Sequence, residues 1–368
     1  MIKRIEKVRN VIKKQNLDAL FVTDQYNVTY LTNFAGLSPN EREGFLLITK
    51  KHAFLLTFPT YFGLYKEGGA GFATLNITHA KRLTDHLAEI IRREKIKSVG
   101  FEKENLTIAE LESLTKTGSD LTGFKGLTPT NGIVEKLRVT KDTNELEYIK
   151  KAAAFTDLAF DFIKTKIKRG ITEKELALEL EFFLKQRADD IAFSPIVAFN
   201  ENAAIPHYLP SPFSQLTNHN LILLDFGAKV GGYCSDMTRV IFFGKPKAGL
   251  AKAYQSVLAA QKLALKILKT GLVCGAIDKS IKKILTSQGY PRYEHGLGHG
   301  VGLAIHEAPR LKIGSKEKLA ENMVVTVEPG IYMEGKYGIR IEDLVVLRKD
   351  GIEILSKSPK LLKELIIL

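Results

Sequence analysis

Three of the chain's eight histidines, His295, His299 and His306, lie within one glycine-rich stretch, residues 292–310. Neutral imidazole is the commonest protein ligand of a transition metal and the commonest acid–base group. Glycine lets the backbone approach whatever the imidazoles hold. A single histidine is more often an ordinary core or surface residue, but three together favour a metal or acid–base site. Such a site also needs negative charge from elsewhere in the chain.

Four carboxylates occur in runs that otherwise resemble buried strands. Asp225 follows Leu221–Leu224, Glu328 follows Met323–Val327, and Asp236 and Glu342 lie in similar surroundings. An unpaired carboxylate inside such a strand costs several kcal/mol, roughly 2–7 for a polar group alone, or else becomes protonated. The four acids therefore require compensating positive charge, and Arg239 and Arg340 supply too little of it.

Residues 220–244 are expected to form a hairpin that turns through Val230, Gly231 and Gly232. Two adjacent glycines suit a tight turn with positive φ. A turn centred there would place Asp225 opposite Asp236, with Cβ atoms about 5 Å apart. Two carboxylates that close repel each other unless a cation lies between them.

The four acids and His299 together can hold two divalent ions, because four negative charges balance four positive ones. Two metals about 3.5–4 Å apart would leave a bridging hydroxide as the reactive group and would stabilise a tetrahedral oxyanion. Mixed oxygen and nitrogen ligands suit Mn, Co or Zn. We therefore expect two divalent ions, with Mn preferred.

The surrounding elements repeat in order at an offset of about 100 residues. Helices expected near 144–168 and 172–187 precede His207 and the acids Asp225 and Asp236. Helices expected near 250–269 and 276–287 precede the histidine stretch and the acids Glu328 and Glu342. The repeat predicts an α+β domain with pseudo-twofold halves that face one shared cleft in a closed sheet.

The first part of the chain mixes helical and strand patterns, which predicts a separate α/β domain. Helices are expected over 1–16 and 84–94, and strand-like runs over 17–23, 27–34, 45–49, 53–58 and 98–101. None of these runs carries a catalytic pattern. The turn-rich residues 128–132 are the best boundary. The prediction is therefore two domains, 1–132 and 133–368.

Composition limits the remaining functional classes. No apolar run approaches the roughly 20 residues that span a bilayer, and the N-terminus lacks an apolar signal-type region. The two cysteines, Cys234 and Cys274, make no disulfide framework, so we expect a cytoplasmic protein. The net charge of +13 raises nucleic acid as a partner, but the lysines are spread along the chain beside glutamates. A solvated surface, with no nucleic acid and no membrane as partner, is the preferred interpretation.

These residues and spacings resemble the pita-bread metallopeptidases, the family of methionine aminopeptidase, aminopeptidase P and prolidase. The resemblance rests on several motifs of the region from about 133 to the end: Leu-Asp-Phe-Gly-Ala, Tyr-Cys-Ser-Asp-Met-Thr-Arg, Gly-His-Gly-Val-Gly, His-Glu-Ala-Pro, Val-Glu-Pro-Gly-Ile-Tyr and Gly-Ile-Arg-Ile-Glu-Asp. More weakly, residues 17–20 and 27–34 are similar to the creatinase/prolidase N-terminal domain.

The resemblance implies a role for each metal ligand. Asp225 would bind one metal, and His299 and Glu328 would bind the other. Asp236 and Glu342 would bridge the two ions. Glu328 would also take the proton of the attacking water.

Further residues would contact the substrate or support the ligands. His207 and His306 would hydrogen-bond the scissile carbonyl and its oxyanion. His295 matches a histidine that lines the proline subsite. The remaining residues are a cation that could meet a substrate carboxylate, Arg310, and two that orient the ligands, Tyr233 and Arg340.

The large N-terminal domain and the retained metal ligands imply cleavage of the bond before proline, by an Xaa-Pro aminopeptidase or an Xaa-Pro dipeptidase. The partners would be proline-containing peptides and a second copy in a homodimer. One departure, Phe199-Asn200 where relatives have glycine before asparagine, leaves the preferred first residue open. The alternative is a metal-free pseudoenzyme of the same fold that binds nucleic acid or protein.

Overall fold

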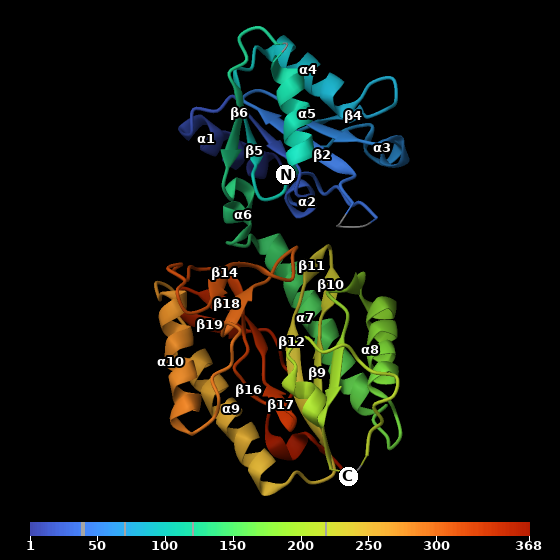
Figure 1. Cartoon of the computed structure of the whole chain (residues 1–368), viewed down its shortest axis with the longest axis vertical. Helices are drawn as coiled ribbons and strands as arrows, with labels where there is room; N and C mark the ends of the chain where they lie inside the picture. The colour runs from blue at the N-terminus through green and yellow to red at the C-terminus, as the bar shows by residue number, and fades with distance from the viewer. Residues whose placement is uncertain (38–40, 70, 120, 218) are drawn as a thin grey trace. The chain divides into compact units, whose positions relative to one another are not determined.

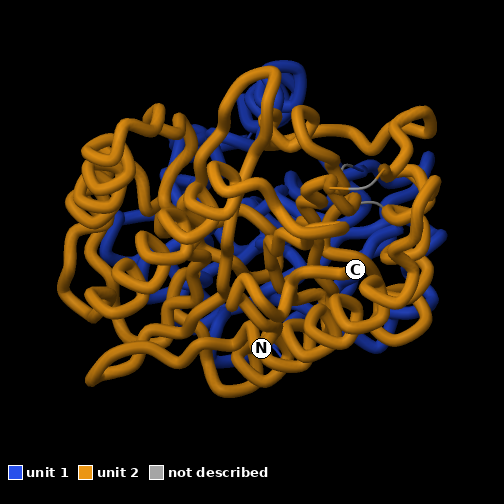
Figure 2. Tube along the Cα trace, turned by 90° about the horizontal axis from the view of Figure 1, so that it is seen from below, with its two compact units in different colours: residues 1–138 blue, residues 139–368 orange. Residues whose placement is uncertain are grey.

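The computed structural model describes residues 1–37, 41–69, 71–119, 121–217 and 219–368. The chain forms two compact units, Met1–Arg138 and Val139–Leu368 (Figure 2). Among the described residues, no helix is both long enough and apolar enough to cross a membrane.

The first unit is a mixed six-stranded sheet with helices packed on it (Figure 1). The strands follow the spatial order β4 (Ala73–Asn76), β3 (Ala53–Thr57), β2 (Gly44–Thr49), β1 (Ala19–Val22), β5 (Ser98–Glu102) and β6 (Gly126–Thr130). The helices are α1 (Ile2–Lys14), α2 (Gln25–Thr32), α3 (Pro59–Tyr65), α4 (Leu83–Glu94), α5 (Ile108–Ser119) and α6 (Ile133–Arg138). Residues on one face of α1, including Ile5, Val8 and Ile12, are buried, as their helical spacing predicts.

The strand expected over residues 27–34 is wrong, because this stretch is the helix α2. The Asp24 carboxylate accepts a hydrogen bond from the Asn27 backbone amide and caps the helix start. Asn33 ends the helix in the left-handed conformation, with φ 60°. Burial of Val28 and Leu31 outweighs the strand preference of the β-branched and aromatic residues.

The division between the units falls later than the turn-rich boundary predicted from the sequence. Helix α6 follows that turn directly and still belongs to the first unit. Its residues Ile133 and Val134 are buried. The turn at 128–132 therefore separates two elements of one unit, and the second unit begins at Val139.

The first half of the second unit supplies two helices and then strands. The elements are α7 (Thr143–Lys164), α8 (Glu173–Arg187), β7 (Asp190–Ile191), β8 (Ile196–Phe199), η1 (Asn200–Ala204), β9 (Asn220–Phe226), β10 (Ala228–Val230), β11 (Tyr233–Cys234) and β12 (Met237–Phe243). Helix α8 begins with a capping box, in which the side chains of Thr172 and Glu175 each accept from the other's backbone amide.

The second half repeats this order. Its elements are α9 (Ala248–Ile267), α10 (Cys274–Ser287), β13 (Gly298–Gly300), β14 (Glu307–Leu311), β15 (Val324–Val327), β16 (Gly330–Met333), β17 (Tyr337–Arg340), β18 (Asp343–Arg348), β19 (Gly351–Ile354), η2 (Leu362–Glu364) and β20 (Ile366–Ile367). Antiparallel β8-β9-β12 in the first half correspond to antiparallel β13-β15-β18 in the second.

The two main sheets of the catalytic unit share one hydrophobic core. Helices α9 and α10 lie on one flank of the strands and α8 lies on the other (Figure 1). The apolar strand residues that predicted burial, such as Leu223 on β9 and Val325 on β15, are buried in the same cluster. The pseudo-twofold halves are therefore confirmed, but among the described residues they form separate sheets rather than a single closed one.

The predicted register of the first hairpin is wrong. Asp225 on β9 pairs with Thr238, and Asp236 lies before β12 begins. The chain leaves the ladder after Phe226 and makes the short strands β10 and β11, which belong to another sheet. Gly227 permits this crossing, because a Cβ atom there would lie 1.9 Å from the Ser235 carbonyl oxygen. Asp225 and Asp236 therefore come near each other because the chain leaves the β9–β12 ladder between them, and not as a cross-strand pair.

Packing around β17 gives a test of this arrangement. A Cβ atom at Gly338 would lie 1.7 Å from the Ala203 carbonyl oxygen of η1. We expect Gly338→Ala to destabilise the catalytic unit by about 1–3 kcal/mol or more, as other over-packed sites do. Thermal unfolding measures this change. Gly249→Ala on α9 is the control, because nothing lies within 4 Å of the added methyl group. Equal melting temperatures of the two variants would contradict the described packing.

Candidate metal centre

One cleft of about 840 Å³ in the catalytic unit contains nearly all of the predicted site residues. The predicted residues in its lining are His207, Asp225, Asp236, His295, His299, His306, Arg310, Glu328, Arg340 and Glu342. Tyr233 is the predicted residue that is not part of the lining. The cleft therefore assembles side chains that are separated by more than 130 positions, from residue 207 to residue 342.

The acids stand at ends of buried strands. Asp225 lies on β9 and Asp236 just before β12, both from the first half. Glu328 follows β15 and Glu342 lies between β17 and β18, both from the second half. The strands are buried on both faces, so these positions are fixed by packing rather than by solvent.

His299 on β13 lies between acids of the two halves. Its Nε2 atom is 3.5 Å from Asp236 Oδ2 and 3.5 Å from Glu328 Oε1. One ligand atom each of Asp236, His299 and Glu342 lie within 4.8 Å of one another, and all three residues are buried. This spacing is compatible with a bound cation, because carboxylate and imidazole atoms hold metals at about 2.0–2.2 Å.

Two buried oxygens support the assignment of a cation site. Asp225 Oδ1 and Glu342 Oε1 lack a hydrogen-bond partner among the described residues. Buried polar atoms nearly always have a hydrogen-bond partner. A buried carboxylate oxygen without one therefore indicates that another group binds it. The donor set of carboxylates and one imidazole fits a divalent metal. On this test the residues fit the metals that the sequence predicts.

The electrostatics of the protein alone disfavour charged carboxylates here. Burial, followed by the charges of Glu342 and Asp225, raises the pKa of Asp236 well above its ordinary range. Burial is also the main cause that raises the pKa of Glu328 to about 7 and the pKa of Glu342 well above its ordinary range. Without added positive charge, the acids would hold protons near neutral pH.

The charge state and the orientation of the His299 imidazole suit it to bind a metal. Burial lowers its pKa to about 3, so the ring is neutral. Its Nδ1 atom donates to the Gly300 carbonyl oxygen at 3.1 Å, which leaves the lone pair on Nε2. Nε2 is the atom that faces Asp236 and Glu328.

A hydrogen-bonded chain connects His295 to Asp225. Burial lowers the pKa of His295 to about 3, and its neutral ring donates from Nδ1 to the Gly296 carbonyl at 2.7 Å. Nε2 therefore accepts from the Tyr332 hydroxyl at 2.8 Å. That hydroxyl oxygen accepts from Arg340, which also donates to Asp225 Oδ2 at 2.5 Å.

Sequence reasoning missed three residues of this network. Tyr332 connects His295 to Arg340, and Thr238 accepts from Arg340 at 2.9 Å and donates to Glu342 Oε2 at 2.7 Å. Thr326 donates to Glu328 Oε1 at 3.2 Å. Each of the three is a polar residue within a strand. The two threonines lie two residues from an acid of the site, and the tyrosine lies four residues after one. This spacing was the available signal in the sequence.

Tyr233 and the pair Phe199-Asn200 are not among the residues that line the cleft. The Tyr233 hydroxyl donates to Glu145 at 2.9 Å, and the ring stacks on Tyr148, so both contacts anchor β11 to α7. Phe199 is a buried core residue, and the Asn200 side chain accepts from the Leu221 amide. The contacts described here connect these residues to neighbouring helices and strands.

The other predicted residues lie in the same cleft. The rings of His306 and His299 lie 4.4 Å apart in an edge-to-face arrangement. Burial and the charge of Arg310 lower the pKa of His306. His207 and Arg310 are exposed side chains in the lining of the same cleft. The lining also includes apolar residues near His207, namely Pro195, Ile196, Leu209 and Ile305.

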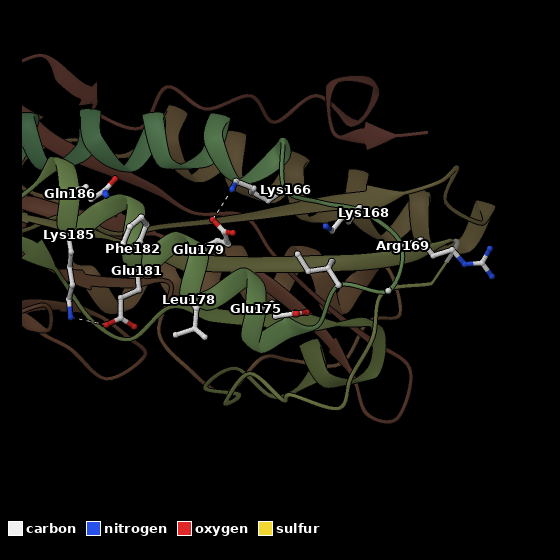
Figure 3. Close-up of a pocket in the computed structure, with 12 residues that line it drawn as sticks. Lys166, Lys168, Arg169, Glu175, Leu178, Glu179, Glu181, Phe182, Lys185 and Gln186 are labelled. Atoms are coloured by element: carbon white, nitrogen blue, oxygen red, sulfur yellow. Dashed lines mark hydrogen bonds and ion pairs between the residues drawn. The ribbon is translucent and has the colours of Figure 1, made fainter.

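A larger hollow, about 1060 Å³, lies on the outer face of α8 (Figure 3). Its lining contains none of the predicted site residues. Lys166 pairs with Glu179 and Lys185 pairs with Glu181, so its charges largely neutralise one another. The smaller cleft, which holds the unsatisfied carboxylate oxygens, is therefore the candidate functional site.

Comparison with known proteins identifies the family to which the chain belongs. Metallopeptidase family M24 matches residues 147–349, and the creatinase/prolidase N-terminal domain matches residues 4–140. An uncharacterised peptidase of Bacillus subtilis is 36% identical over 99% of this chain and 100% of its own.

Two solved structures have the same architecture. An Xaa-Pro dipeptidase from Bacillus anthracis has a TM-score of 0.91 at 35% identity and covers 99% of both chains. An X-Pro aminopeptidase from Thermotoga maritima has a TM-score of 0.86 at 31% identity, covering 96% of this chain and 98% of that one. The chain therefore belongs to metallopeptidase family M24 and carries a creatinase/prolidase N-terminal domain.

Proposed function

We propose that this protein is a metal-dependent exopeptidase that hydrolyses the bond between an N-terminal residue and a following proline. The observation that carries the proposal is the assembly, in one cleft, of unsatisfied carboxylate oxygens around a neutral imidazole, with further histidines and Arg310 beside them. Family membership supports peptide hydrolysis. The names of the relatives, an Xaa-Pro dipeptidase and an X-Pro aminopeptidase, support proline in the second position.

Five residues would hold two divalent ions: Asp225, Asp236, His299, Glu328 and Glu342. When bound, such ions activate a water molecule and polarise the scissile carbonyl group. Arg340 keeps Asp225 oriented by a charge-assisted hydrogen bond. Thr238 does the same for Glu342, and Thr326 for Glu328.

The other residues act on the peptide and on protons. Glu328 accepts the proton of the attacking water, since its carboxylate lines the cleft beside the His299 ring. His207 and His306 donate hydrogen bonds to the scissile carbonyl oxygen as negative charge develops on it. His295 packs beside the proline ring, with its own ring fixed by Tyr332. Arg310 meets the substrate carboxylate.

The dipeptidase and aminopeptidase activities both remain open, because they differ only in whether another residue is attached after the proline.

Hydrolysis of an Xaa-Pro dipeptide and of an Xaa-Pro-Yaa tripeptide, each measured with Mn²⁺ and with EDTA, distinguishes the two activities. We expect cleavage of at least one peptide with Mn²⁺ and none with EDTA, because the metal-free acids hold protons. Cleavage of the dipeptide alone identifies a dipeptidase, and cleavage of the tripeptide an aminopeptidase. Full activity in EDTA would contradict the proposal.

Glu342→Ala separates hydrolysis from a binding function without metal. The substitution removes a ligand, so kcat should fall by more than the roughly 10–100-fold typical of residues that only support a ligand. Peptide hydrolysis and metal content by elemental analysis give the result. Lys316→Ala, an exposed residue outside the cleft lining, is the matched control. Wild-type turnover by Glu342→Ala would show that the ligand assignment is wrong. The net charge of +13 favours the alternative, a binding protein for nucleic acid, only if the wild type neither binds metal nor hydrolyses peptides.

Metal binding should depend on pH in a defined direction. Near pH 6 Glu328, with its pKa raised to about 7, is mostly protonated in the metal-free protein, whereas His299, with its pKa lowered to about 3, is already neutral. Binding of Mn²⁺ must therefore displace protons from carboxyl groups and none from the histidine. Affinity should rise from pH 6 to pH 8. Calorimetry in buffers of different ionisation enthalpy measures the protons released, and identical heats in all buffers would refute this prediction.

The expected homodimer and the preference for manganese remain predictions. Light scattering after gel filtration measures the mass against 41.0 kDa for one chain. Activity of the apoprotein restored with Mn²⁺, Co²⁺ or Zn²⁺ in turn ranks the metals.

A further inference from the structure

The segment 301–306 connects β13 to β14 and carries His306 at its end. The residue before the segment, Gly300, pairs in register with Glu307, the residue after it. The His306 side chain is exposed, and its ring meets the His299 ring edge to face. The position of the ring also depends on what holds the backbone at the base of this segment.

An ion pair lies at that base. The ammonium group of Lys141 is 2.6 Å from Glu307 Oε1, and Glu307 is the residue after His306. The Lys141 side chain is 0% exposed and that of Glu307 is 10% exposed. Lys141 is fixed on its own side, because its amide donates to the Asn322 carbonyl and its ammonium donates to the Val139 carbonyl.

The Glu307 carboxylate is also held against the opposite end of the segment. A Cβ atom at Gly302 would lie 2.3 Å from Glu307 Oε1, so the carboxylate packs directly on the Gly302 backbone. The Gly302 carbonyl oxygen accepts from the Cys234 amide at 2.8 Å. Glu307 therefore crosses the base of the segment from Lys141 to Gly302, and the ends of the segment are set relative to β11.

We propose that Lys141, acting through Glu307, is a positioning residue that sets the place of the His306 ring beside the metal ligands. The inference rests on the proposed function, since it assigns His306 a hydrogen bond to the reacting carbonyl group. Lys141 is not among the residues that line the cleft and cannot touch a substrate itself. Because the pair is buried, loss of the cation removes a charge-assisted hydrogen bond that holds the Glu307 carboxylate at the base of the segment.

The test is a double-mutant cycle between Lys141→Met and His306→Ala on the metal-loaded enzyme, with kcat and KM measured for an Xaa-Pro substrate. A ring displaced by about 1 Å can lose roughly a hundredfold in rate. We expect Lys141→Met to lower kcat by at least about tenfold, with a smaller change in KM, in the wild-type background. In the His306→Ala background it should change kcat less than about twofold. An equal loss in both backgrounds would overturn the proposal, because Lys141 would then act on something other than His306.

Two further variants keep the test decisive if Lys141→Met folds poorly. Gly302→Ala displaces the Glu307 carboxylate without removing a charge, and it should lower kcat in the same His306-dependent way. Lys141→Arg keeps the cation and should recover most of the rate. Leu180→Ala is the stability control, because Leu180 is fully buried on α8 and is not among the residues lining the cleft. It should lower the melting temperature and leave kcat unchanged.

A readout without hydrolysis separates this inference from the proposed function. In protein labelled with ¹³C-histidine, the His306 resonance, assigned by its loss in His306→Ala, should shift in Lys141→Met and stay in place in Leu180→Ala. A shift in a protein that cleaves no Xaa-Pro peptide would support the positioning and reject the function. An unshifted resonance would reject the positioning.

Discussion

The mutual repulsion of four carboxylates, three buried and one partly buried, is the constraint on which the second unit depends. Asp225, Asp236, Glu328 and Glu342 converge on one cleft, and burial raises the pKa of three of them. Arg340 offsets part of this charge. Repulsion of this size is stable only with bound cations or bound protons. The site therefore needs bound protons or bound cations, and the proposed divalent ions would supply the second.

The residues of the site are divided between the two related halves. Each half contributes two acids at the ends of strands that are otherwise apolar, and the second half adds His299. Because the strands are packed on both faces, the acids cannot relax away from one another. Polar strand residues such as Thr238 then orient the carboxylates. Stability of the core thus maintains a site that would be unfavourable by itself.

The side chains of His207 and His306 are held in place in a different way. Both side chains are exposed, so their placement depends on contacts made by neighbouring residues. At His306 the buried pair Lys141–Glu307 provides such a contact. Under the proposed roles, core packing would hold the metal ligands, and a buried charge pair at the base of a loop would hold a histidine that contacts the substrate.

The sequence by itself determined the identities that chemistry requires and the period of the elements that bear them. Asp225, Glu328 and His299 stood out because charge or imidazole interrupted apolar or glycine-rich runs. The repeated order of helices and strands predicted the two halves. The sequence could not determine long-range register, which placed Asp225 opposite Thr238 rather than Asp236. Nor could it reveal that residues 25–32 form a helix, that Tyr332 connects His295 to Arg340, or that Lys141 meets Glu307 across 166 positions. Local pattern reports burial and periodicity, whereas these contacts depend on which surfaces the folded chain brings together, and only the tertiary structure decides that.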